Sequence, residues 1–214
     1  MTRQVILWRH GRTEWNVAGR VQGQSDIPLD EVGHQQARSA ARRLAALRPQ
    51  RILSSDLIRA RETAGYLSAA TGVEIDYDPR FRELNFGARE GLTWREAWDQ
   101  MPGGMKAWVN GDETQIPGSE THEQAGDRFA EGLAAALPSL PGDGVLVVVA
   151  HGAVLRTGIC RFLGIPPAHW GTFGALNNCS WSVLEETPWR PDTQWRLTEW
   201  NAGTLPEPVL SDEE

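Results

Sequence analysis

The sequence has few of the residues on which small secreted domains and zinc domains depend. Its 214 residues include two cysteines, Cys160 and Cys179, which form no CxxC pair and have no zinc-like spacing. A chain of this length buries enough apolar surface to fold without disulfides or a structural metal. Unpaired cysteines are typical of reducing compartments, so we expect both to be core residues of a cytoplasmic protein.

Long apolar runs and an excess of basic charge are also absent. The apolar run from Val145 to Val149 is too short to cross a bilayer, and Met1 is followed by polar residues, so we expect neither a membrane span nor a signal peptide. The net charge of −7 argues against general nucleic-acid binding. All but one of the 21 basic residues are arginine, whose planar guanidinium suits phosphate and carboxylate groups.

Tryptophan, by contrast, is plentiful. There are ten tryptophans against two tyrosines, and most lie in two groups, one between residues 94 and 108 and one between residues 170 and 200. Packing in the core is the favoured interpretation of these groups. A contact between two copies of the chain, giving a homodimer, is the alternative.

Alternating apolar segments and helical patterns predict an α/β fold. Strands are predicted at residues 4–8, 52–55, 73–77 and 145–149. Helices are predicted to begin near Asp30 and near Asp56, and the N-cap of the second helix would be Ser54, Ser55 or Asp56. We therefore expect three α/β/α layers around a mostly parallel sheet. Residues 178–184 and 194–200 are expected to form an edge hairpin.

One segment does not follow this alternation. A tryptophan-rich helix is predicted from Thr93 to about Asn110, broken at residues 101–104, and we interpret residues 92–120 as a short helical lid. The helix that begins near Glu120 places His122 in its first turn, where a surface position is expected. The prediction is one domain over residues 1–202, followed by a loose acidic tail over residues 203–214.

Two predicted strands end in the same dipeptide. His10-Gly11 follows the first strand and His151-Gly152 follows the buried β-branched run. Ligands bind at the carboxyl ends of strands in open α/β sheets. For an Arg-His-Gly triplet alone, a simple turn is the better interpretation. With Arg59 at a third junction and Glu83 in a loop, however, the chain offers a nucleophile, fixed positive charge and an acid, which are the groups that phosphoryl transfer needs.

Four motifs in this order resemble the histidine phosphatase superfamily, in its phosphoglycerate-mutase-like branch. They are Arg9-His10-Gly11-Arg12-Thr13 with Asn16, Ser55-Asp56-Leu57-Ile58-Arg59-Ala60 with Thr63-Ala64, Glu83 with Phe86-Gly87 and Glu90-Gly91, and Ala150-His151-Gly152. Trp8 departs from the pattern, because the family usually has a smaller aliphatic residue there.

The resemblance implies roles for individual residues. His10 would become phosphohistidine and Glu83 would be the proton donor. Arg9, Arg59 and His151 would bind the phosphoryl group. The substrate pocket would be lined by matching positions, namely Asn16, Gln22, Gly23 and Gly152. Neither a metal nor a cofactor is implied, and the partner would be a small phosphorylated substrate.

The resemblance leaves two reactions open, phosphate-ester hydrolysis and a mutase reaction. Residues 86–94 lack the lysine found in similar mutases, and the predicted lid is short, so hydrolysis is favoured. The segments 178–181 and 195–201 resemble actinobacterial family members that hydrolyse glucosyl-3-phosphoglycerate. Small phosphosugars or phosphoglycerate derivatives are the expected substrates, with broad-specificity hydrolysis close behind. The alternative from another class of function is a regulatory module that binds a phosphorylated ligand and catalyses no reaction.

Overall fold

The computed structural model describes residues 2–190 and 194–203. The predicted tail lies outside the described residues except for Gly203. The strands are β1 (Gln4–Arg9), β2 (Arg51–Ser54), β3 (Ile75–Tyr77), β4 (Val145–Ala150), β5 (Trp181–Glu186) and β6 (Trp195–Ala202). The α-helices are α1 (Glu14–Val17), α2 (Glu31–Ala45), α3 (Ile58–Thr71), α4 (Trp94–Gln100), α5 (Pro102–Val109), α6 (His122–Ala136) and α7 (Gly152–Phe162). The short 3-10 helices are η1 (Pro79–Phe81), η2 (Gly87–Arg89), η3 (Glu113–Gln115), η4 (Leu137–Ser139) and η5 (Pro167–Thr172).

The described strands form one sheet in the order β3-β2-β4-β1-β5-β6. The pairs β3–β2, β2–β4 and β4–β1 are parallel, whereas β5 pairs antiparallel with both β1 and β6. The predicted mostly parallel sheet and edge hairpin are therefore confirmed. Because β1 and β4 are parallel neighbours, their carboxyl ends meet, with Arg9 opposite Ala150.

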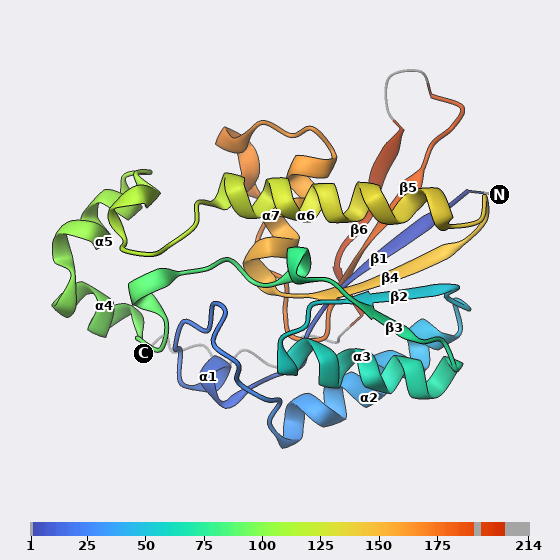
Figure 1. Ribbon diagram of the computed structural model, residues 1–214, viewed down its shortest axis with the longest axis horizontal. Helices are drawn as coiled ribbons and strands as arrows, with labels where there is room; N and C mark the ends of the chain where they lie inside the picture. The colour runs from blue at the N-terminus through green and yellow to red at the C-terminus, as the bar shows by residue number, and fades with distance from the viewer. Residues whose placement is uncertain (1, 191–193, 204–214) are drawn as a thin grey trace, which may run out of the picture.

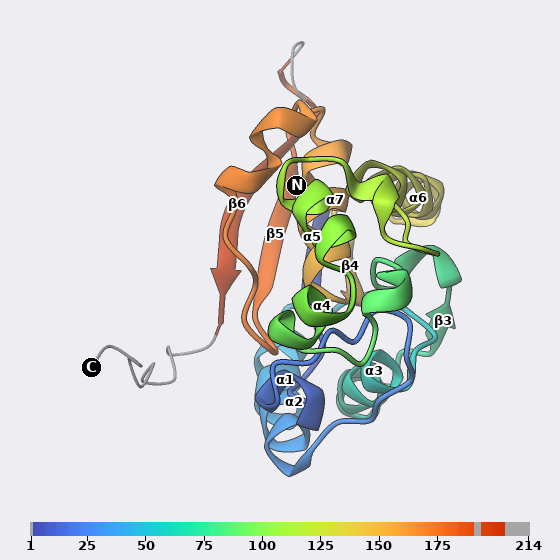
Figure 2. The same ribbon diagram turned by 90° about the vertical axis from the view of Figure 1, so that its left-hand side faces the viewer.

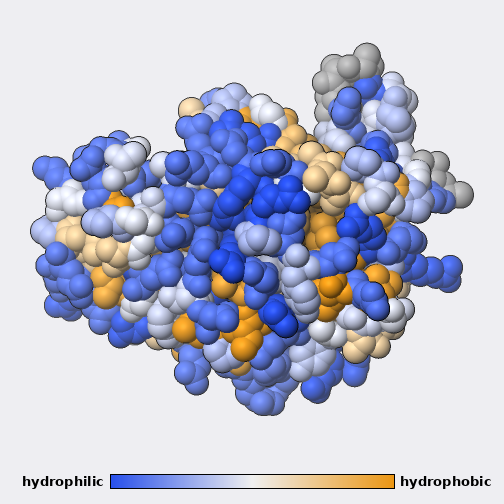
Figure 3. Space-filling model, viewed as in Figure 1, coloured by the Kyte–Doolittle hydropathy of each residue, from blue (hydrophilic) through white to orange (hydrophobic). Residues whose placement is uncertain are grey.

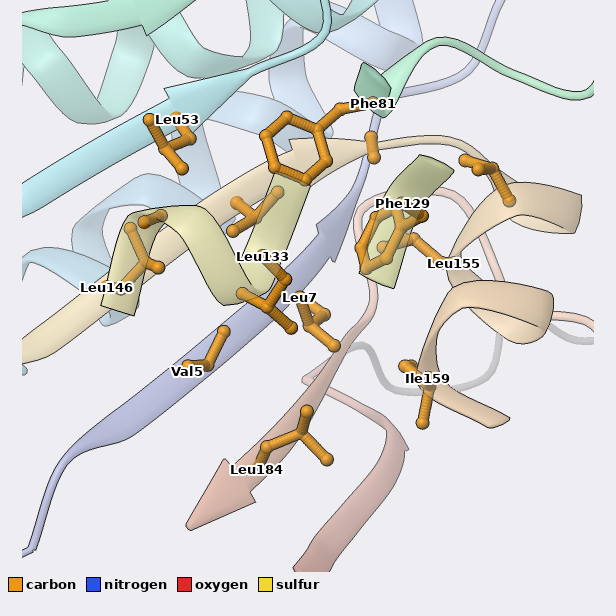
Figure 4. Packing of buried hydrophobic residues seen from close by; sticks show 14 of the residues in the cluster. Val5, Leu7, Leu53, Phe81, Phe129, Leu133, Leu146, Leu155, Ile159 and Leu184 are labelled. Carbon is orange, nitrogen blue, oxygen red and sulfur yellow. The ribbon is translucent and has the colours of Figure 1, made fainter. Parts of the chain in front are cut away.

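Helices cover both faces of the sheet, with α6 and α7 above it and α2 and α3 below it in Figure 1. Side chains of β1 alternate between the two faces, as the pleat requires. Val5 and Leu7 pack in the cluster under α6 and α7 (Figure 4), and Ile6 and Trp8 pack in the cluster against α2 and α3. Burying one such aliphatic side chain contributes about 1.5–3 kcal/mol to folding. The sheet thus holds the end of β1 rigidly from both sides.

The buried Trp8 accounts for the departure noted in the sequence. Its indole is fully buried in the lower cluster, to which α2 contributes the small side chains of Ala37, Ala40 and Ala41. Trp8 Nε1 donates a hydrogen bond of 3.2 Å to the carbonyl of Cys179. Small residues on the facing helix therefore accommodate the large side chain, and the hydrogen bond fixes residue 179 beside the end of β1.

The predicted N-cap of α3 was wrong. The cap is Leu57, which makes no side-chain cap, and Asp26 Oδ1 instead accepts the Ile58 N–H at 2.6 Å. Ser55 Oγ accepts the Leu57 N–H at 3.3 Å, one residue before the helix begins, and also lies 2.8 Å from His151 Nε2. The serine expected to start the helix is thus used to hold an imidazole.

Residues 94–109 form two helices at the end of the molecule toward which β1, β2 and β4 run (Figures 1 and 2). Thr93 starts α4 with a capping box, and Pro102 occupies the first turn of α5, where the missing N–H of proline has no cost. The predicted break at residues 101–104 is therefore a helix start. Ala97, Met105 and Ile116 form a small separate core for this segment.

Hydrophilic residues cover most of the face in Figure 3, and hydrophobic ones lie in separate groups among them. Within the described ranges, no helix is long and apolar enough to cross a membrane. The same residues contain no group of three or more His, Cys, Asp or Glu side chains that could hold a metal ion.

Candidate active site

A cavity of about 340 Å³ opens beside the carboxyl ends of β1 and β4. Its walls come from stretches that are far apart in the chain, listed here in sequence order. They are Arg9, His10, Asn16, Arg20, Val21, Gln22, Gly23, Arg59, Glu83, Phe86, Arg89, Trp94, Trp108, His122, Ala153 and Arg156. Seven of the nine predicted site residues are in this list. His151, which is fully buried, and Gly152 are not.

His10 follows β1 and is almost fully buried. Its Nδ1 lies 2.7 Å from the Gly11 carbonyl oxygen, an acceptor, so the ring proton sits on Nδ1 and the lone pair on Nε2. Burial, followed by the charges of Arg59 and Arg9, lowers the pKa of His10 well below its usual 6.5. The imidazole is neutral at pH 7, with Nε2 available as a nucleophile.

His151 caps the start of α7, and its ring centroid lies 5.1 Å from that of His10. Arg59 Nε donates to His151 Nδ1 at 3.1 Å, so the ring proton sits on Nε2, which lies 2.8 Å from Ser55 Oγ. Burial, then the charge of Arg59, lowers the pKa of His151 well below 6.5. Both rings are therefore neutral, but in opposite tautomers.

Arg59 is fully buried and joins the second histidine to a loop. Its other two nitrogens donate to the carbonyls of Ser25 at 2.7 Å and Gly23 at 2.6 Å. Burial lowers the pKa of Arg59 to about 10, so the guanidinium keeps its charge at neutral pH. Arg9 is partly buried, desolvation lowers its pKa, and its guanidinium donates to the Leu176 carbonyl. Two fixed positive charges thus face the cavity beside His10.

Glu83 lies at the amino end of α7. Its Oε1 accepts the N–H groups of Leu84 and Val154 at 2.8 and 2.9 Å, and its Oε2 accepts the Ala153 N–H at 3.1 Å. A helix amino terminus attracts negative charge, so it holds a carboxyl in place here. Gly152 packs beside Arg9, since a Cβ there would lie 3.4 Å from Arg9 Nε, an ordinary van der Waals distance.

Hydrogen bonds orient the predicted pocket residues. Asn16 Oδ1 accepts from the Thr13 N–H and from Asn178 Nδ2, which leaves the Asn16 amide nitrogen for the cavity. Gly23 has a positive φ of 53°, and its carbonyl holds Arg59. Gln22 is buried, and its Oε1 has no partner among the described residues. The Asn16 amide nitrogen is thus a donor beside the cavity, and Gln22 Oε1 is an acceptor without a partner among the described residues.

Glu90 is a positioning residue that the motif match included without giving it a role. Its carboxylate accepts the N–H groups of Gln24, Ser25 and Phe86 at 2.9, 3.0 and 3.2 Å. It thereby ties the loop that holds Arg59 to the segment that carries Glu83. A Cβ on Gly23 would lie 2.0 Å from Glu90 Oε1, so only glycine fits there.

The expected surface position of His122 was wrong. It lines the cavity, its side chain is 18% exposed, and its Nδ1 pairs with Glu113. The residues that sequence reasoning missed are on the outer wall, chiefly Arg89, Arg156 and Trp108. Motif spacing could not find them because they meet only through the packing of α5 and η3 against α6 and α7.

Comparison with known proteins agrees with this geometry. The model of the histidine phosphatase superfamily (branch 1) matches residues 5–203, so the chain belongs to that superfamily. It is an enzyme of the phosphatase class.

Named relatives cover almost the whole chain. It is 37% identical to glucosyl-3-phosphoglycerate phosphatase of Mycobacterium tuberculosis (strain CDC 1551 / Oshkosh), over 94% of this chain and 95% of the relative. It is 39% identical to a probable phosphoglycerate mutase GpmB of Enterobacter sp. (strain 638), over 87% of each. The native structure of a mycobacterial glucosyl-3-phosphoglycerate phosphatase superposes with a TM-score of 0.85 at 34% identity, covering 95% of this chain and 100% of that one.

Proposed function

We propose that this protein hydrolyses small phosphorylated metabolites, with glucosyl-3-phosphoglycerate or a related phosphoglycerate derivative as its substrate. The observation that carries the proposal is the neutral His10, whose Nε2 keeps its lone pair at the wall of a cavity lined by Arg9 and Arg59. Similarity to glucosyl-3-phosphoglycerate phosphatases over nearly the whole chain supports the choice of substrate.

The first step transfers the phosphoryl group to the protein. His10 Nε2 attacks phosphorus, a P–N bond forms, and the P–O bond to the alcohol breaks. Glu83 gives its carboxyl proton to the leaving oxygen. The guanidiniums of Arg9 and Arg59 bind the phosphoryl oxygens, whose charge they balance in a buried setting where such contacts are strong.

The second step returns the protein to its starting state. A water molecule attacks phosphorus and gives a proton to the Glu83 carboxylate, while the P–N bond breaks and the electron pair returns to His10 Nε2. In the structure His151 Nε2–H bonds to Ser55 Oγ. During the reaction it exchanges that hydrogen bond for one to a phosphoryl oxygen. Asn16, Gln22, Gly23 and the region of Gly152 complete the substrate contacts.

The test is phosphate release from an aryl phosphate and from glucosyl-3-phosphoglycerate by the wild-type protein and His10→Ala. We expect a loss of about 10⁴-fold or more in kcat for both substrates, because the covalent nucleophile is gone. Equal rates in the two proteins would contradict the nucleophile assignment and favour a binding module. Stimulation by 2,3-bisphosphoglycerate with interconversion of phosphoglycerates would identify a mutase instead.

We also propose that the protein works in the cytoplasm. The support is that Cys160 and Cys179 are both buried and unpaired. Burial raises their pKa values to about 11 and about 12, so both thiols stay protonated.

A further inference from the structure

The outer wall of the cavity carries a second pair of guanidiniums, separate from Arg9 and Arg59. Arg89 ends η2, and Arg156 lies on α7, three residues beyond Ala153 and hence on the same face of that helix. Both line the cavity that His10 lines. Neither is needed for the two chemical steps described above.

Arg89 is buried without an anionic partner. It is 4% exposed, its guanidinium makes no hydrogen bond within the described part of the chain, and its buried Nε has no acceptor. Its guanidinium carbon lies 4.2 Å from the Trp108 ring centroid and 4.9 Å from that of Phe86. Burial lowers its pKa, while the charge of Glu113 raises it. The guanidinium is thus fixed between two aromatic rings, and its terminal N–H groups are left over for a ligand.

Arg156 is almost as short of acceptors. Its Nε is buried and unpartnered, and one terminal nitrogen lies 3.5 Å from His122 Nε2, at the limit of a hydrogen bond. The His122 ring lies 6.3 Å from the Trp108 ring, which in turn contacts Arg89. Successive contacts through Trp108 and His122 thus connect the two arginines, and both line the same cavity.

The charges around these two arginines favour a singly charged ligand group. Arg89 and Arg156 contribute two positive charges, and the nearby Glu113 contributes one negative charge through its contact with His122. One net positive charge remains, which suits a carboxylate better than a phosphate dianion. Guanidinium donors in a planar fork match a carboxylate geometrically as well.

We propose that Arg89 and Arg156 form a carboxylate subsite, so that the enzyme selects phosphate esters of hydroxy acids. The proposal rests on the proposed phosphatase function and assigns the acid group of the substrate to the outer wall of the same cavity. The exposed indole of Trp94, on the same wall, leaves an apolar surface beside that group for the rest of the alcohol.

The experiment compares 3-phosphoglycerate with glycerol 3-phosphate, which has a hydroxymethyl group in place of the carboxylate. Arg89→Met and Arg156→Met each remove the charge and keep a long apolar stem. We expect kcat/KM for 3-phosphoglycerate to fall by about 10- to 100-fold in each variant and that for glycerol 3-phosphate by less than about threefold. Arg61→Met, on the exposed side of α3, is the matched control and should leave the ratio of the two values unchanged.

Other outcomes overturn the subsite. An equal fall for both substrates in both variants, with a lower unfolding temperature, would make the arginines packing residues. No fall for either substrate would remove them from substrate binding. A greater fall for 1,3-propanediol bisphosphate than for 3-phosphoglycerate would make the bound group a phosphate. His10-dependent hydrolysis of glycerol 3-phosphate is measured in the same assay, so the phosphatase function can stand when the subsite fails.

Discussion

The two His-Gly junctions are alike in sequence and differ in how their imidazoles are bonded. His10 uses Nδ1 for a backbone carbonyl and has no partner for Nε2 within the described residues, whereas His151 is bonded through both nitrogens, to Arg59 and Ser55. One ring is therefore free to attack, and the other holds a guanidinium. Partners from elsewhere in the chain, rather than the dipeptide, distinguish the proposed nucleophile from the proposed positioning group.

The strongest test of this difference replaces the second ring. His151→Ala should lower kcat by about 10²- to 10³-fold, because Arg59 loses its acceptor and the phosphoryl group loses a contact. A phosphoenzyme should still form on His10, and rapid-quench labelling with a radioactive phosphate ester would detect it. Labelling that persists in His10→Ala but disappears in His151→Ala would reverse the two roles.

A second test moves the loop that holds Arg59. Gly23→Ala should reduce kcat/KM by about 10- to 100-fold, since its Cβ would meet Glu90 Oε1 at 2.0 Å and displace the carbonyl that binds Arg59. Gly19→Ala is the matched control. Gly19 has a similar φ of 63° but no atom within 4 Å of its Cβ, so it has the same backbone strain without the clash. Equal losses in the two variants would mean that strain alone is responsible.

The smallest expected effect is on stability. Both rings have pKa values below 6.5 when folded, so between pH 6.5 and those values the unfolded chain binds more protons than the folded protein. The two neutral rings should make their full contribution to stability above pH 6.5. On acidification below that pH, the free energy of unfolding should fall by about 1.4 kcal/mol per pH unit for each ring. Urea unfolding between pH 7.5 and 5.5 should show a shallower slope for His151→Ala than for the wild type. Parallel slopes would show that the pKa of His151 is the same in the folded protein and in the unfolded chain.

Much of the fold follows from the sequence because its signals are local. The apolar run at residues 145–149 and the spaced alanines of α2 predict a buried strand and a helix face wherever they occur. The inner site was predictable for a related reason. Parallel strands bring their carboxyl ends together, so residues just after β1 and β4 must be neighbours.

The outer wall was not predictable in this way. Helical position correctly placed His122 in a first turn, but only the packing of α5 and η3 decides that this turn faces the cavity rather than solvent. The same packing encloses Arg89 between Trp108 and Phe86. The N-cap error at Ser55 has a similar origin, because its hydroxyl contacts a residue far along the chain as well as the Leu57 N–H.

The central position of β1 has a consequence for the order in which the site is made. Its neighbours are β4 and β5, which begin at Val145 and Trp181, so the strand that carries the nucleophile gains its sheet partners only after most of the chain has left the ribosome. The carbonyl of His10 is also held by Asn178 and by the Cys179 N–H. During synthesis the proposed nucleophile is therefore made first and oriented last, so an incomplete chain carries the His10 imidazole without the strands and hydrogen bonds that orient it.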